Sequence, residues 1–151
     1  MTDTDTTRTR PPTAPVIVEG HSAAAIAHTR DVARLFVDGL RPPAAPRTAE
    51  TLALVVSELA TNSLRHGGGR YTLELTANAE AVDVAVSDPS PARPQERTPD
   101  LSGGTGGFGW PMVRHLASRV TVTAGPGRGK TVHVRLPRRP AKQAAIDPPR
   151  T

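Results

Sequence analysis

Two segments of the chain place apolar residues three and four positions apart, the spacing that lines one face of a helix. The first follows Ser22, a residue type that caps helices, and ends at Gly39 ahead of two prolines. The second begins at Thr48 and reaches about His66, where a run of glycines ends it. Both segments are therefore predicted helices with one core-facing side. The core-facing positions are Ala25, Ile26, Val32, Leu35 and Phe36 in the first and Leu52, Val55, Val56, Leu59 and Ser63 in the second.

Short segments with alternating apolar and polar residues, or with clustered β-branched residues, are typical of strands. Residues 71–76 and 82–87 alternate on either side of a short turn and predict an antiparallel hairpin. Residues 110–118 have a helical pattern, and Pro111 falls in the first turn, where proline is tolerated. This order of elements predicts an α/β (α+β) two-layer sandwich, with a mixed, largely antiparallel sheet and its helices on one face. The other predicted strands are 16–18, 120–122 and 131–136.

The two ends of the chain differ in composition from its middle. Residues 1–15 are rich in Thr, Asp, Arg and Pro, and residues 138–151 are similar, so neither end buries enough apolar surface to offset the entropy of ordering. We expect disordered tails on both sides of one domain at 16–137. With 16 Pro and only 3% aromatic residues in 151, that domain must build its core from Ala, Val and Leu.

Charge and cysteine content limit the function classes. The chain has 19 Lys+Arg, 14 Asp+Glu and no Cys, which excludes disulfides, thiolate metal sites and thiol nucleophiles. The formal net charge of +5 permits binding to polyanions, nucleotide phosphates included. Nucleic-acid binding is disfavoured, because aromatic residues are nearly absent and the basic charge lies mostly in the tails. No apolar run approaches the roughly 20 residues of a membrane span, so we expect a cytoplasmic protein with no membrane association.

Polar residues on one edge of the second helix are candidates for chemistry. Glu58 and Asn62 stand one turn apart and Arg65 follows after another turn, so all three project from one edge beside the core-facing side. A carboxylate can deprotonate a hydroxyl, an amide oxygen suits Mg²⁺, and a guanidinium can neutralise phosphate. The alternative interpretation is an exposed polar edge with no ligand.

Two loops supply further candidates. Asp88 comes directly after a predicted strand, a common position for a residue that receives a ligand, although Asp-Pro is also ordinary turn chemistry. A glycine-rich segment, which includes Gly107, Phe108 and Gly109, leads directly into the third predicted helix. Exposed backbone N–H groups at such a helix N-terminus can cradle phosphates.

Taken in order, these segments resemble the N, G1, G2 and G3 boxes of the Bergerat-fold ATPases, the superfamily of gyrase and the histidine kinases. The closest likeness is to the stand-alone anti-sigma-factor serine/threonine kinases and to related actinobacterial ATP-binding regulatory proteins. The resemblance covers roughly residues 16–137, and it implies a histidine-kinase-like ATPase fold with ATP and Mg²⁺ as cofactors.

The resemblance also implies roles for individual residues. Glu58 would activate the attacking hydroxyl, Asn62 would hold Mg²⁺, and Arg65 would lie near the phosphates. Asp88 would accept the exocyclic amino group of adenine, and a lid of about 89–106 would close over the nucleotide. The other residues implied are Gly107, Phe108 and Gly109 in the G2 box, Thr131 in the G3 box, and Arg93 and Arg97 as phosphate contacts in the lid.

The implied function is that of an ATP- and Mg²⁺-binding regulator. Such a protein phosphorylates a serine or threonine of a small antagonist protein, sequesters a sigma factor and so regulates transcription. Ser90 and Thr105 depart from the family pattern, because they stand where the G1 and G2 boxes usually have glycine. The alternative is a non-catalytic, ATP-dependent switch that orders its lid and so controls a protein partner. A homodimer formed near the first helix is also compatible with the resemblance.

Overall fold

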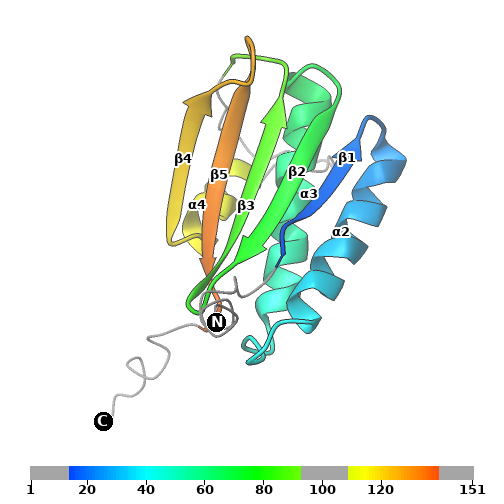
Figure 1. The fold of residues 1–151 in the computed structure, drawn as a ribbon. Helices are drawn as coiled ribbons and strands as arrows, with labels where there is room; N and C mark the ends of the chain where they lie inside the picture. The colour runs from blue at the N-terminus through cyan, green and yellow to red at the C-terminus, as the bar shows by residue number, and fades with distance from the viewer. Residues whose placement is uncertain (1–13, 93–108, 140–151) are drawn as a thin grey trace, which may run out of the picture.

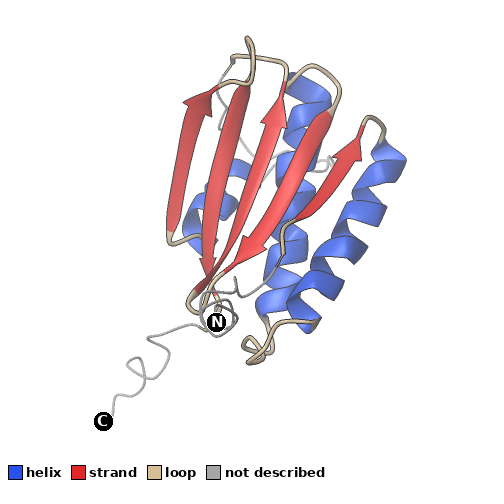
Figure 2. Ribbon diagram, viewed as in Figure 1, coloured by secondary structure: helices blue, strands red, loops and turns tan. Residues whose placement is uncertain are grey.

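The computed structural model describes residues 14–92 and 109–139, which form a five-stranded sheet and three helices (Figure 1). The strands are β1 (Val16–Gly20), β2 (Tyr71–Ala77), β3 (Ala81–Asp88), β4 (Arg119–Ala124) and β5 (Lys130–Pro137), and the helices are α2 (Ala23–Asp38), α3 (Thr48–His66) and α4 (Gly109–Leu116). The strand order is β1-β2-β3-β5-β4, and each of the four pairings is antiparallel. The three helices lie on one face of the sheet (Figure 2).

This architecture confirms the predicted two-layer α+β sandwich with helices on one face. The sheet, expected to be mixed and largely antiparallel, contains only antiparallel pairs among its described strands. The reason lies in the strand order, because β2 and β3 form a hairpin and β5 runs between β3 and β4, antiparallel to both. None of the helices that the structure describes is long and apolar enough to span a membrane.

One hydrophobic core lies between the helices and the sheet. Alternate residues of each central strand point toward the helices. On β3 these residues are Val82, Val84 and Val86, each at most 1% exposed. All five predicted core-facing residues of α3 are buried against this layer, Ser63 included. The polar edge of α3 that begins at Glu58 is therefore held at the border of the core.

The core-facing side of α2 differs from the prediction at Leu35, which is 69% exposed. Successive residues of a helix are about 100° apart, so a buried stripe through Ala33, Phe36 and Val37 leaves Leu35 on the opposite side, toward solvent. Thr29 takes a core position because its hydroxyl forms a 2.8 Å hydrogen bond with the hydroxyl of Tyr71. The buried residues of α2 are Thr29, Ala33, Phe36 and Val37.

Arg138 is buried directly after β5, one residue beyond the predicted end of the domain. Its guanidinium donates hydrogen bonds to the backbone oxygens of Asn78, at 2.6 Å, and of Pro42. Its own backbone oxygen accepts hydrogen bonds from the amide of Ala45, at 2.9 Å, and from the hydroxyl of Thr48, at 3.1 Å. This residue therefore joins the end of the sheet to the β2–β3 turn and to the segment between α2 and α3.

Replacing Arg138 by alanine is expected to lower the free energy of unfolding by about 2 kcal/mol, because two backbone oxygens would lose a charged donor. Arg139→Ala is the matched control. The Arg139 side chain is exposed and donates to the backbone oxygen of Pro43 at 3.0 Å, so its loss should leave stability almost unchanged. Chemical denaturation measures both variants, and equal stability of the two would show that Arg138 does not hold this end of the fold.

Candidate functional site

The polar edge of α3 lies beside the first residue of α4. Glu58 and Asn62 are half-buried on this edge, and Arg65, one turn further along, is exposed. The Glu58 carboxylate packs so closely against Gly109 that a methyl group on Gly109 would overlap its Oε1 atom. Glycine at this position therefore allows α4 to begin directly against Glu58.

The environment of Glu58 changes how readily its carboxylate binds a proton. Burial raises the pKa of the Glu58 carboxyl above its ordinary value, and the positive charge of Arg65 opposes that rise. Arg65 acts from the same edge of α3, because it lies two helical turns further along. A carboxylate with a raised pKa accepts a proton more readily than an exposed glutamate does, and this property suits a general base.

The side-chain amide of Asn62 indicates where a ligand would bind on this edge. Its Nδ2 atom is buried and has no hydrogen-bond partner among the residues that the structure describes. An unpaired buried polar group costs roughly 1–3 kcal/mol, so a bound partner would stabilise it. The amide nitrogen can donate to a phosphate oxygen, and the amide oxygen can bind a hard cation such as Mg²⁺. The donor set of this edge therefore fits a phosphate group with its bound cation.

Asp88, the last residue of β3, forms a second cluster at the end of the sheet. Its side chain is 3% exposed and pairs with Lys130, whose Nζ atom lies 2.8 Å from Oδ1 and 3.0 Å from Oδ2. The Ser63 hydroxyl donates to Oδ2 at 2.8 Å, and the Ser90 amide donates to Oδ1 at 3.1 Å. One carboxylate thus ties α3 and the start of β5 to the end of β3.

Two glycines let the neighbouring elements approach Asp88. Gly67 follows the last residue of α3, and a methyl group on it would overlap the Asp88 carboxylate. Gly129 precedes β5, and a methyl group on it would overlap the backbone oxygen of Asp88. The end of α3 and the start of β5 therefore both contact Asp88 through residues that have no side chain.

Lys130 was not among the residues predicted for the site, and Ser63 was predicted only as a core residue. Lys130 stands directly opposite Asp88 in the β3–β5 register, so both side chains point to the helix face of the sheet. Ser63 does face the core, and its hydroxyl is satisfied there by Asp88. The sequence signal for Lys130 was its alternation with the buried Val132 and Val134, which places all three on one face.

Thr131, predicted to lie beside the base, has its side chain on the other face of the sheet from Asp88. It stands opposite Ser87 in the register, and the two hydroxyls are 2.8 Å apart. The Thr131 hydroxyl also donates to the backbone oxygen of Gly125 at 2.8 Å. The structure therefore brings Lys130, and not the side chain of Thr131, into contact with Asp88.

The remaining predicted site residues lie outside the part of the chain that the structure describes. Gly107 and Phe108 lie outside the described residues, and so do Arg93 and Arg97. The predicted lid at 89–106 is described only over 89–92. Gly109 is therefore the one predicted glycine-loop residue whose position is known here.

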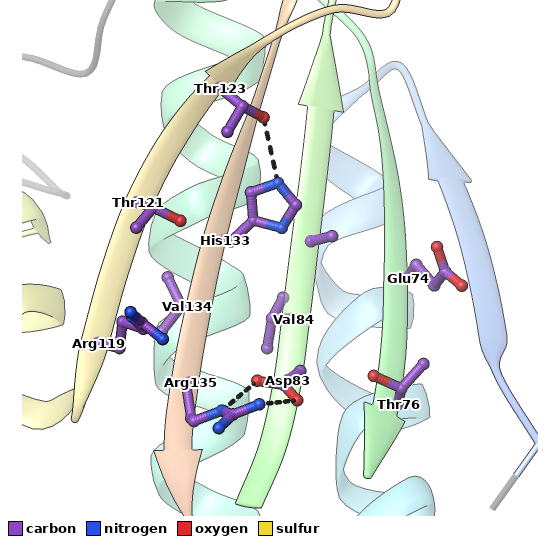
Figure 3. Close-up of a pocket in the computed structure, with 11 residues that line it drawn as sticks. Glu74, Thr76, Asp83, Val84, Arg119, Thr121, Thr123, His133, Val134 and Arg135 are labelled. Atoms are coloured by element: carbon purple, nitrogen blue, oxygen red, sulfur yellow. Dashed lines mark hydrogen bonds and ion pairs between the residues drawn. The ribbon is translucent and has the colours of Figure 1, made fainter. Parts of the chain in front are cut away.

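The open face of the sheet carries a separate shallow hollow of about 500 Å³ (Figure 3). Four of its polar side chains form two pairs: Arg135 with Asp83 at 2.9 Å, and Thr123 with His133 at 3.2 Å. None of the predicted site residues lines this hollow. Because its polar side chains project from the face opposite to Asp88, the hollow is distinct from the candidate site, which consists of the α3–α4 edge and the Asp88 cluster.

Comparison with known proteins agrees with the fold. The family model for the histidine kinase-like ATPase domain matches residues 22–136. A similar solved structure is that of the RsbU and RsbW domains of Rv1364c from Mycobacterium tuberculosis, with a TM-score of 0.60 and 18% sequence identity over 83% of this chain. The present chain spans only 32% of that chain's length. No curated protein sequence matches. Because the family model covers well over half of its residues, this chain belongs to the histidine kinase-like ATPase domain family.

Proposed function

We propose that this chain binds ATP with Mg²⁺ and transfers the γ-phosphoryl group to a serine or threonine hydroxyl of a partner protein. Membership of the ATPase family supports the nucleotide part of the proposal. The observation that carries it is the joint position of Glu58, Asn62 and Gly109. A proton acceptor, an unpaired buried amide and the start of a helix meet at one edge of the core.

The transfer requires one bond to form and another to break. The acceptor hydroxyl oxygen bonds to the γ-phosphorus, and the bond between that phosphorus and the β–γ bridging oxygen breaks. ADP leaves with the electron pair, and the Glu58 carboxylate takes the hydroxyl proton. Asn62 would hold Mg²⁺, which when bound neutralises charge on the phosphate oxygens. Arg65 adds positive charge on the same edge.

The N-terminus of α4 is the proposed location of the phosphates. Backbone N–H groups at the start of a helix have no partner within the helix, and the helix dipole favours negative charge there. Gly109 adds no side chain that would block this approach. Gly107 and Phe108 belong to the same glycine-rich segment, and their contribution stays a prediction. The proposed base-recognition residue is Asp88, at the other end of the site.

The proposed partners are a small antagonist protein, as phosphoryl acceptor, and a sigma factor that the chain sequesters. The fold likeness to a structure that contains an RsbW domain supports this choice. ATP-dependent association with a partner but no phosphoryl transfer would instead favour the alternative, a non-catalytic switch. Formation of a homodimer stays a prediction.

Replacing Asn62 by alanine is expected to weaken ATP binding about tenfold and to remove its dependence on Mg²⁺, because the amide that would contact the cation and a phosphate is lost. Trp110 is the only tryptophan of the chain and adjoins Gly109, so its fluorescence can follow a titration with ATP in the presence and absence of Mg²⁺. Thr61→Ala, a change at the neighbouring half-buried polar residue of α3, is the control. Failure of the unaltered protein to bind ATP at millimolar concentration would contradict the proposed function.

A further inference from the structure

We propose that Lys130 competes with the nucleobase for Asp88 and thereby sets how strongly this protein distinguishes ATP from GTP. The inference rests on the proposed nucleotide site, and it concerns the base end of that site. Lys130 and Asp88 stand opposite each other on β5 and β3, and their side chains are in direct contact.

The hydrogen-bonding capacity of the Asp88 carboxylate is already used in full. An ionised carboxylate has about four lone-pair positions for hydrogen-bond donors. Oδ1 accepts from Lys130 at 2.8 Å and from the Ser90 amide at 3.1 Å, and Oδ2 accepts from Ser63 at 2.8 Å and from Lys130 at 3.0 Å. An amino group of a base therefore finds no vacant acceptor on Asp88 while Lys130 is in place.

The ammonium group of Lys130 is satisfied in the same way. An ammonium has three N–H donors. They reach the two oxygens of Asp88 and, at 3.3 Å, the backbone oxygen of Ser90. Both partners of the ion pair therefore have their hydrogen bonds within the protein, and neither one offers a free group to a base.

Burial makes this pair costly to open. The side chains of Lys130 and Asp88 are 7% and 3% exposed. Gly67 approaches the carboxylate of Asp88 and Gly129 approaches its backbone oxygen, so backbone fills the space on these two sides of the residue. Separating a buried ion pair leaves a charge without compensation, and the neutral amino group of adenine cannot replace the lysine charge. Adenine recognition by Asp88 must therefore offset the loss of the Lys130 contact.

The consequence is weak discrimination between adenine and guanine. At the same ring position adenine presents an amino donor and guanine presents a carbonyl acceptor. A free carboxylate attracts the amino group of adenine and repels the carbonyl group of guanine, whereas a carboxylate paired with an ammonium does neither. Most of the binding energy then comes from contacts with the triphosphate, which is the same in ATP and GTP. The unaltered protein should bind ATP and GTP with affinities within about threefold of each other.

Lys130→Met tests this competition, because methionine keeps the length of the side chain but offers no donor to Asp88. The affinity for ATP should rise about tenfold or more, and the affinity for GTP should stay constant or fall. Lys130→Arg is the control, since it keeps the charge and the donors and should keep the weak selectivity of the unaltered protein. Adding Asp88→Asn to Lys130→Met should cancel the gain for ATP. Trp110 fluorescence titrations with ATP and GTP measure all four proteins.

Measurements on the unaltered protein keep the inference testable if Lys130→Met does not fold. Inosine triphosphate, which lacks the amino group, and inorganic tripolyphosphate, which lacks the base, should compete with ATP almost as well as GTP does. A preference for ATP over GTP and inosine triphosphate of more than about tenfold in the unaltered protein would overturn the inference and leave the proposed function intact. Binding of no triphosphate, by the unaltered protein or the variant, would contradict the proposed function and the inference with it.

Discussion

Replacing Glu58 by glutamine is expected to slow phosphoryl transfer by about 10²–10⁴-fold, the range that a positioned general base contributes. Glutamine keeps the size of the side chain and its packing against Gly109, but it cannot accept the hydroxyl proton. Binding of ATP should change little, because Asn62 and the start of α4 are left intact. Transfer of labelled γ-phosphate and release of ADP at saturating ATP measure the loss, and Trp110 fluorescence measures binding.

The stability of Glu58→Gln provides an independent test of the burial of the Glu58 carboxyl. Because burial raises the pKa of the Glu58 carboxyl in the folded chain, its ionisation opposes folding. Below the ordinary pKa of 4.5 the carboxyl is neutral in both the folded and the unfolded chain, so Glu58 does not destabilise the fold there. The destabilisation develops as the pH rises through the raised pKa of the folded chain. Nucleotide-free Glu58→Gln should therefore unfold at a higher denaturant concentration than the unaltered protein at neutral pH, and equally at low pH.

Glu50→Gln is the matched variant for this comparison. Glu50 lies in the first turn of the same helix and pairs with Arg34 at 3.0 Å on an exposed surface. Its replacement should therefore give no gain in stability at neutral pH. A Glu58→Gln protein that binds ATP and transfers phosphate as fast as the unaltered chain would remove Glu58 from the proposed mechanism. Binding in both proteins with no turnover in either would favour the non-catalytic switch.

The elements of this fold could be predicted because the signals that define them are local. The stripe of α3 follows a 3.6-residue repeat, and its predicted residues are all buried. The alternation on β3 likewise identified the hairpin and its buried face. Leu35 was assigned wrongly because several apolar residues of α2 fit a helical stripe, and only packing against the sheet selects among them.

The composition of the site depends on contacts between distant parts of the chain. Glu58, Asn62 and Arg65 lie on one helix, so their common edge follows from helical geometry. Lys130 and Asp88 are 42 positions apart, and their pairing depends on the register between β3 and β5, which no local pattern fixes. A one-residue difference in that register decides whether the lysine or the following threonine faces Asp88. The shared edge of α3 was therefore predictable, and the contact of Lys130 with Asp88 was not.

Replacing Gly129 by alanine is expected to lower the free energy of unfolding by about 3 kcal/mol, because the added methyl group would overlap the backbone oxygen of Asp88. No rotation of a side chain can relieve contact with a backbone atom, so β3 and β5 must separate where Asp88 faces Lys130. The substitution should therefore disturb the ion pair as well as the fold.

Gly39→Ala is the matched control for this substitution. The C-cap Gly39 has helical backbone angles, and a methyl group there would make only an ordinary contact, 3.5 Å from the backbone oxygen of Leu35. Such a change stabilises a protein by about 0.4–1 kcal/mol, since it restricts the unfolded chain. Chemical denaturation should thus move the two variants in opposite directions. If Gly129→Ala proves as stable as the unaltered protein, then β5 does not approach Asp88 as closely as described, and the Lys130 contact that depends on this approach loses its structural basis.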